Sequence, residues 1–346
     1  MHLRPRALLL CSALLVVGAV GAQDNAALDE ARGAGKYMAD CYGAGDDAAC
    51  NGMLSAYQRA MTHPQADDGL RHAVLVHLLH TASVYGERLR DAGRLPESAN
   101  ILSAGYQTML QHLDGGKHFH TLIDNQRLQL QAALTMDAMG RTADRDGIIA
   151  RARGAVESLY GARAQAAGRD HAIKLLHDGL GEGEVFEMEL ARHYAAKARD
   201  ASDDAARDAS LALSLEAYAR ADTWVRRQAE TGAGEDWAAS QAQISYERGM
   251  ALWNADREEE ASRSFAQSVA SSCTIDDPKD RERLAKELAN RLPGRGFKLM
   301  CQRSADVWQL TNGDFSKALD EALVPIYDQM LKELEEPMPP SLPTFP

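Results

Sequence analysis

The distribution of proline most restricts what this chain can fold into. None of its 11 prolines falls within residues 97–277, a stretch of 181 residues between Pro96 and Pro278. Proline disrupts helix interiors because it lacks an amide hydrogen and collides with the preceding turn. The same stretch is rich in Ala, Leu, Glu, Arg and Gln, which are good helix formers. We therefore expect an all-α fold.

Apolar residues recur at helical spacing on three segments, which predicts amphipathic helices that pack in pairs. The sets are Leu75, Leu79, Ala82, Gly86 and Leu89; Leu128, Ala132, Met136 and Met139; and Leu211, Leu215, Tyr218 and Val225. Clusters of Gly, Asp and Pro predict turns between helices, among them 91–96, 140–144, 178–183 and 200–204. The expected architecture is a series of antiparallel hairpins.

The first 22 residues have the layout of a secretory signal peptide. Arg4 and Arg6 precede an apolar run over 7–17, and the small residues Val20 and Ala22 suit a cleavage site after Ala22. The alternative is an uncleaved anchor, but a 20-residue apolar span is missing. With no second run of that kind, we expect an exported, periplasmic protein.

Charge argues against two classes of partner. The chain has 50 acidic and 38 basic residues and a net charge of −12. Removal of Arg4 and Arg6 with the signal would leave −14. An acidic chain is a poor partner for nucleic acid or for anionic lipid, so neither is expected.

Four cysteines remain once Cys11 is removed with the signal: Cys41, Cys50, Cys273 and Cys301. An even number in an oxidising compartment predicts two disulfides, for which three connectivities exist. We favour Cys41 with Cys50 and Cys273 with Cys301, because each pair closes a short loop. A zinc site is not indicated, since the ligand spacing is absent.

One segment resembles a tetratricopeptide repeat (TPR). Five residues of 245–268 match the motif of that family in type and spacing: Gly249, Asp256, Ala261, Phe265 and Ser268. A looser copy has Gly86 and Gly93 again seven residues apart, with one residue inserted before Ala99. Fainter hairpins lie at 121–160 and 184–228. The resemblance implies stacked helical hairpins in a right-handed solenoid; an irregular helical bundle is the alternative.

These observations divide the chain into five parts. They are the signal peptide (1–22), an N-terminal helical hairpin with a disulfide (23–69), the TPR-like array (70–272), a C-terminal helical cap with a disulfide (273–336) and a Pro-rich disordered tail (337–346).

The TPR resemblance also implies a groove for a partner. The motif positions that line the inner surface of such arrays are Gln243, Tyr246, Met250, Trp253 and Asn254 in the clearer unit. Two amides, a thioether and two aromatic rings suit an extended peptide. The spacing of Tyr246, Met250 and Trp253 equally suits core packing.

Six histidines gather in one part of the sequence: His72, His77, His80, His112, His118 and His120. If their hairpins stacked, imidazole nitrogens could converge on a metal. No HExxH pattern is present, and surface or capping roles explain the same residues.

Catalytic motifs are absent from the sequence. Neither a Gly-x-Ser-x-Gly elbow nor a phosphate-binding Gly-x4-Gly-Lys-Ser/Thr loop occurs, and the glycines of 179–183 are expected in a flexible turn. The carboxylates are expected to be solvated: Glu182, Glu184, Glu187, Glu189 and Glu258 to Glu260.

We therefore expect a non-enzymatic periplasmic scaffold, without a cofactor, that binds a protein or an extended peptide of the cell envelope. One alternative is an acidic inhibitor or immunity-type protein that binds an exported hydrolase or toxin. A second is a metal-assisted hydrolase that uses the histidines of 72–120.

Overall fold

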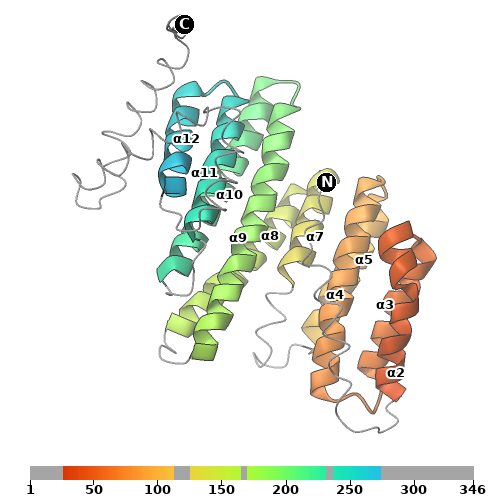
Figure 1. The fold of residues 1–346 in the computed structure, drawn as a ribbon. Coiled ribbons are helices and arrows are strands. Elements are labelled where there is room, and N and C mark those ends of the chain that lie inside the picture. Colours follow the sequence, from red (N-terminus) through yellow and green to blue (C-terminus); the bar gives the residue numbers. More distant parts are fainter. Residues whose placement is uncertain (1–25, 113–124, 165–169, 231–236, 274–346) are drawn as a thin grey trace, which may run out of the picture.

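The computed structural model describes residues 26–112, 125–164, 170–230 and 237–273 (Figure 1). Every regular element within these ranges is a helix, which confirms the all-α prediction. The elements are α2 (Ala26–Gly33), the 3-10 helix η2 (Ala34–Tyr37), the π-helix η3 (Ala39–Ala44), α3 (Asp47–Thr62), α4 (Asp68–Asp91), α5 (Leu95–His112), α7 (Gln126–Ala138), α8 (Thr142–Ala164), α9 (Asp170–Arg199), α10 (Asp204–Glu230), α11 (Trp237–Trp253) and α12 (Glu258–Cys273).

Aspartates define two of the helix starts. The Asp46 carboxylate accepts hydrogen bonds from the N–H groups of Ala48 and Ala49 at 2.7 and 3.1 Å. The Asp67 carboxylate accepts one from the N–H of Leu70 at 2.7 Å. Each bond satisfies a donor that has no partner inside the helix, so α3 and α4 begin directly after these residues.

Helices that follow one another in the chain pack side by side. Figure 1 shows a row that runs from α2 and α3 at one end to α12 at the other. In addition, α4 contacts α7, α7 contacts α9 and α9 contacts α11, while α5, α8 and α10 each contact the helices before and after them. Among the described residues, two large hydrophobic clusters result, one from α2 to α7 and one from α7 to α11, and Ala238 and Ala242 of α11 form a further small one. Each hairpin thus buries its apolar faces mainly against its neighbours in the chain.

Three hairpins share one turn geometry: α4–α5, α7–α8 and α11–α12. Their turn residues Gly93, Gly140 and Asp256 have φ values of 76°, 71° and 58°. An arginine follows in each case, and its backbone N–H donates to the carbonyl five residues earlier: Arg94 to Leu89 at 2.8 Å, Arg141 to Met136 at 2.9 Å and Arg257 to Leu252 at 3.0 Å. This is the hydrogen bonding of a Schellman helix end, which requires a left-handed residue.

A small residue seven positions before each turn allows the two helices to approach closely. A β-carbon on Gly86 would lie 2.6 Å from Leu102, and one on Gly249 would lie 2.6 Å from the Phe265 ring. Ala133 takes this position in the α7–α8 hairpin and is fully buried. Contacts below 3.0 Å force neighbouring atoms to shift, so a larger residue at Gly86 or Gly249 would displace Leu102 or Phe265.

The alignment of the looser copy is corrected by this packing. Ser98 follows Gly93 by five residues, as Ala261 follows Asp256, so no residue is inserted. The Ser98 hydroxyl is buried and donates to the Gly86 carbonyl at 2.7 Å. Ala99 is only half-buried and does not take the position expected for it.

The turn expected at 178–183 is wrong. Helix α9 runs without interruption from Asp170 to Arg199 and includes all three glycines of this segment. A β-carbon on Gly183 would lie 3.1 Å from Val156 and 3.4 Å from Trp224. At this position glycine permits close helix packing, and such packing outweighs its low helix propensity.

The predicted apolar faces of α4 and α10 are buried, apart from the half-buried Leu215. The face predicted for α7 is only partly buried, because Ala132, Met136 and Met139 are half-buried. Since α7 contacts α4, α5, α8 and α9, it is covered on several sides and buries polar residues such as Gln129 as well.

Cys41 and Cys50 form a disulfide, the local pairing favoured from the sequence, with their Cα atoms 4.7 Å apart. Both side chains are fully buried. The Arg88 guanidinium of α4 donates to the Cys41 carbonyl at 2.8 Å and to the Asp47 carboxylate at 3.2 Å. The disulfide and Arg88 together hold the π-helix against α3 and α4.

Several predictions lie outside the described residues: the signal peptide 1–22, most of the C-terminal cap 273–336 with the Cys273–Cys301 disulfide, and the tail 337–346. None of the described helices is long and apolar enough to cross a membrane.

Candidate functional site

The residues of the predicted groove lie along α11 and just beyond its end. Gln243, Tyr246 and Met250 are half-buried, whereas Trp253 and Asn254 are exposed, Trp253 by 43%. The Tyr246 ring lies 6.0 Å from the Phe265 ring of α12. Tyr246 therefore contributes to hairpin packing, whereas Trp253 and Asn254 form the exposed part of the predicted groove.

Positions equivalent to Met250 and Trp253 mediate contacts between hairpins earlier in the chain. They are found by counting six and three residues back from each turn residue. On α4 and α7, three of them reach the first helix of the following hairpin: Glu87 pairs with Arg127 at 3.4 Å, Arg90 donates to Gln131 at 2.5 Å, and Asp137 pairs with Lys197 at 2.8 Å. On α11 the same positions carry a thioether and an indole, so this contact surface changes from polar to apolar.

Two of the candidate metal-ligand histidines, His77 and His80, pack against aromatic rings, while His72 and His112 are half-buried. The His77 ring stacks on Tyr57 and the His80 ring meets Tyr42 edge-on, with ring centroids 6.0 and 5.8 Å apart. Burial lowers the pKa of His77, and burial together with Arg127 and His77 lowers the pKa of His80 to about 4.

Within residues 26–112, 125–164, 170–230 and 237–273, no group of three or more His, Cys, Asp or Glu is arranged to hold a metal ion. His118 and His120 lie outside these ranges.

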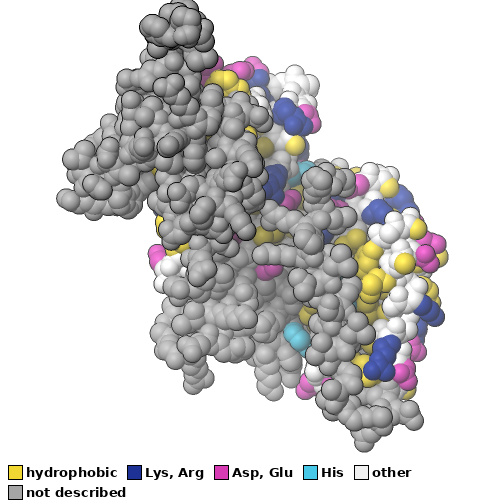
Figure 2. Space-filling view, viewed as in Figure 1, with side chains coloured by type: hydrophobic (Ala, Val, Ile, Leu, Met, Phe, Trp, Pro, Cys, Tyr) yellow, Lys and Arg dark blue, Asp and Glu magenta, His cyan; other side chains and the backbone are white. Residues whose placement is uncertain are grey.

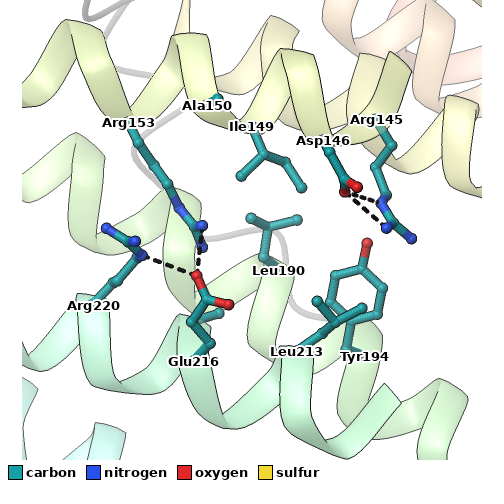
Figure 3. Close-up of a pocket in the computed structure, with 11 residues that line it drawn as sticks. Arg145, Asp146, Ile149, Ala150, Arg153, Leu190, Tyr194, Leu213, Glu216 and Arg220 are labelled. Atoms are coloured by element: carbon teal, nitrogen blue, oxygen red, sulfur yellow. Dashed lines mark hydrogen bonds and ion pairs between the residues drawn. The ribbon is translucent and has the colours of Figure 1, made fainter. Parts of the chain in front are cut away.

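A slot of about 480 Å³ lies between α8 and α10, with α9 as its floor. Its lining is apolar in the middle and charged at both ends (Figure 3). The apolar residues are Ile149, Ala150, Leu190, Leu213 and Ala217, together with the ring of Tyr194; the charged ones are Arg145, Asp146, Arg153, Glu216 and Arg220. Its volume falls within the range of small-molecule sites.

Arg153 is the most firmly held of the charged residues. Its Nε and one terminal nitrogen bind both oxygens of Glu187 on α9, at 2.7 and 2.8 Å. The other terminal nitrogen donates to Glu216 of α10 at 2.9 Å. The Glu187 carboxylate is buried, which raises its pKa, while Arg153 acts in the opposite direction. A buried carboxylate therefore fixes a guanidinium that faces Glu216.

Glu216 is the shared acceptor at this end of the slot. The same oxygen that binds Arg153 also accepts from Arg220 Nε at 3.2 Å. Half of the Glu216 side chain is exposed to solvent. This carboxylate therefore occupies a position between two guanidinium groups but can leave it at modest cost, since ion pairs in water are weak.

Asp137 of α7 organises the other end of the slot. Its buried carboxylate accepts from Arg145 at 2.8 Å and from Lys197 of α9 at 2.8 Å, and it lies 3.1 Å from His193. These three partners outweigh burial and hold the pKa of Asp137 below its ordinary value. Arg145 also pairs with Asp146, which lines the slot.

Sequence reasoning missed this slot. Glu187 was expected among solvated carboxylates, yet it is fully buried, so that prediction is wrong for this residue. One signal was present: in 182–190, Glu187 lies one residue after the buried Phe186 and three before the buried Leu190. Its partner Arg153 comes from another hairpin, and nothing in the sequence pairs the two.

Other ion pairs lie on the surface and do not line the slot. Figure 2 shows basic and acidic side chains interspersed along the edge of the N-terminal helices. Examples are Arg32 with Asp29, Arg59 with Glu30 and Arg71 with Asp68. Exposed pairs of this kind contribute little stability.

Comparison of the chain with protein-family models, with curated protein sequences and with solved structures finds no match.

Proposed function

We propose that this chain is an exported, non-enzymatic scaffold of stacked TPR-like hairpins that binds a protein or an extended peptide of the bacterial cell envelope. The main support is the shared register of three hairpins. Each has a small residue seven positions before a left-handed turn residue and a bulky apolar residue nine positions after it. These triplets are Gly86, Gly93 and Leu102; Ala133, Gly140 and Ile149; and Gly249, Asp256 and Phe265. Repetition of one packed unit is typical of arrays whose surfaces serve as binding sites.

Export to the periplasm is supported by two independent features. One is the signal-like segment 1–22, and the other is the Cys41–Cys50 disulfide, since disulfides persist in oxidising compartments.

The binding surface that we propose is the α11 row of Gln243, Tyr246, Met250, Trp253 and Asn254. Met250 and Trp253 are its apolar anchors, because large apolar side chains with solvent-exposed area dominate binding energies when a partner covers them. The two amides at the ends of the row suit the backbone of an extended peptide.

The test is cross-linked capture of partners from an envelope extract of the host, with the wild-type protein and three variants. Trp253→Ala and Met250→Ala remove the anchors. Trp237→Ala is the matched control, because Trp237 opens the same helix and is 38% exposed. Thermal unfolding shows whether each variant remains folded.

The proposal requires a partner that is captured by the wild type and the Trp237 variant and lost from the other two. A partner that all variants retain, but that is released at high salt, supports the acidic inhibitor instead. Equal loss from all three variants would remove the α11 row as the binding surface.

A further inference from the structure

We propose that the slot between α8 and α10 binds a small amphipathic carboxylic acid, of the class of a medium-chain fatty acid, with its carboxylate between Arg153 and Arg220. This site is separate from the α11 row and does not depend on the proposed scaffold function.

The middle of the slot is suited to an apolar chain. Ile149 on α8, Leu190 on α9 and Leu213 on α10 approach it from three helices (Figure 3). Ala150 and Ala217 contribute only methyl groups, which leaves room for a ligand. Transfer of each methylene group from water to such a surface should raise the affinity about fourfold, so affinity should increase with chain length.

One end of the slot is suited to a carboxylate. Arg153 is oriented by two hydrogen bonds to the buried Glu187, and it directs its third nitrogen to the oxygen that Arg220 also binds. A guanidinium held in place before the ligand arrives loses little entropy on binding.

Glu216 at present fills this position from within the chain. One oxygen of its carboxylate accepts from both Arg153 and Arg220, which shows that the position between these two guanidinium groups suits a carboxylate oxygen. Because the side chain is half exposed, a ligand carboxylate can replace it while Glu216 turns to solvent. The lining as a whole has three guanidinium groups against two carboxylates, in a chain of net charge −12.

The opposite end of the slot is less suited to an anion. Among the lining residues, Arg145 is the one guanidinium at this end, and it is bound by Asp146 and by the buried Asp137, whereas Arg153 and Arg220 together face the first end. This asymmetry orients the ligand, with its acid group toward Arg153 and its apolar chain toward Tyr194.

Binding is measured with the purified protein and the fluorescent probe 1-anilinonaphthalene-8-sulfonate, which has an apolar body and an anionic group. Octanoate, butyrate and 1-octanol are then compared as competitors. Octanoate should displace the probe at a concentration about tenfold or more below that of butyrate, because its chain is longer. Octanoate should also displace the probe at a concentration about tenfold below that of 1-octanol, because only the acid pairs with Arg153 and Arg220.

Two variants locate the site. Glu216→Gln removes the internal competitor and should tighten octanoate binding by about fivefold, with no change for 1-octanol. Glu157→Gln is its matched control: Glu157 is 48% exposed, against 49% for Glu216, and pairs with Arg227 of α10, but it does not line the slot. Ala217→Trp fills the slot and should weaken probe binding about tenfold or more, whereas Ala212→Trp, at an exposed position of α10, should not.

Circular dichroism melting confirms that each variant is folded. The proposal is overturned if octanoate is no better than 1-octanol or butyrate, or if Glu216→Gln behaves like Glu157→Gln. It is also overturned if a folded Ala217→Trp variant binds the probe as the wild type does. If Ala217→Trp does not fold, the comparison of Glu216→Gln with Glu157→Gln tests the proposal by itself.

Discussion

Gly249 and Phe265 lie so close together that no side chain fits between them: a β-carbon on Gly249 would be 2.6 Å from a ring carbon of Phe265. Gly86 and Leu102 have the same relationship in the α4–α5 hairpin. The two pairs hold equivalent positions relative to their turns, which links hairpins separated by more than a hundred residues.

This relationship predicts the effect of alanine. Gly249→Ala and Gly86→Ala should each lower the free energy of unfolding by about 1–3 kcal/mol, because the rigid hairpin core has to shift. Gly154→Ala in α8 is the control, since nothing lies within 4 Å of its β-carbon position. It should be neutral or stabilising by up to about 1 kcal/mol. Urea unfolding measures all three, and equal effects at all three sites would contradict the close-packing account.

The Cys41–Cys50 disulfide should stabilise the N-terminal part of the array. Removal of both cysteines, as Cys41→Ala with Cys50→Ala, should cost about 2–4 kcal/mol. Reduction of the wild type should bring its stability near that of this double variant. Intact mass should rise by about two hydrogens on reduction for each disulfide, and by about four if Cys273 and Cys301 are also bonded. Free thiols at Cys41 and Cys50 in the untreated protein would contradict the structure.

Asp137 should contribute to stability at neutral pH. Its pKa in the folded protein is lower than in the unfolded chain, so its contribution is complete above the unfolded value of about 3.9 and declines as the pH falls below it. Asp137→Asn should lower the free energy of unfolding by about 3 kcal/mol at pH 7, because Arg145 and Lys197 lose a buried anion.

The same variant should lose less stability than the wild type as the pH falls from about 4 to about 2, because the unfolded chain begins to protonate Asp137 near the reference aspartate pKa of about 3.9. Asp144→Asn is the control, because Asp144 is exposed and pairs with Arg141 at the turn. Its effect should stay within about 0.5 kcal/mol. Denaturant titrations at a series of pH values provide the data. A parallel pH dependence of wild type and Asp137→Asn would contradict this role.

His80 should make the free energy of unfolding depend on pH at higher pH values than Asp137 does. Its folded pKa of about 4 is below the ordinary value of 6.5, so the unfolded chain takes up a proton first as the pH falls. Stability should therefore decline from about pH 6.5 toward pH 4. His80→Gln should reduce this slope. NMR titration of the His80 ring should find it neutral at pH 5.5, and a protonated ring at that pH would contradict the burial of His80 against Tyr42.

The sequence alone was sufficient to predict the features that arise from interactions between residues close together in the chain. The proline-free stretch predicted helices because proline acts on its own helical turn. Gly93 and Gly140 marked turns because a left-handed residue is a local requirement. Cys41 and Cys50 are nine residues apart, so their pairing also followed from the sequence.

Tertiary structure decided the features in which two distant segments meet. Gly183 suggested a turn, but the contact with Val156 and Trp224 makes it a packing position inside α9. Glu187 stands in the sequence among other acidic residues, Glu182, Glu184 and Glu189, and its burial is compensated by Arg153, which comes from α8. Local propensity acts within a few residues, whereas burial depends on which surfaces face each other after the helices have packed. For that reason the helices and turns of this protein were predictable and the slot between α8 and α10 was not.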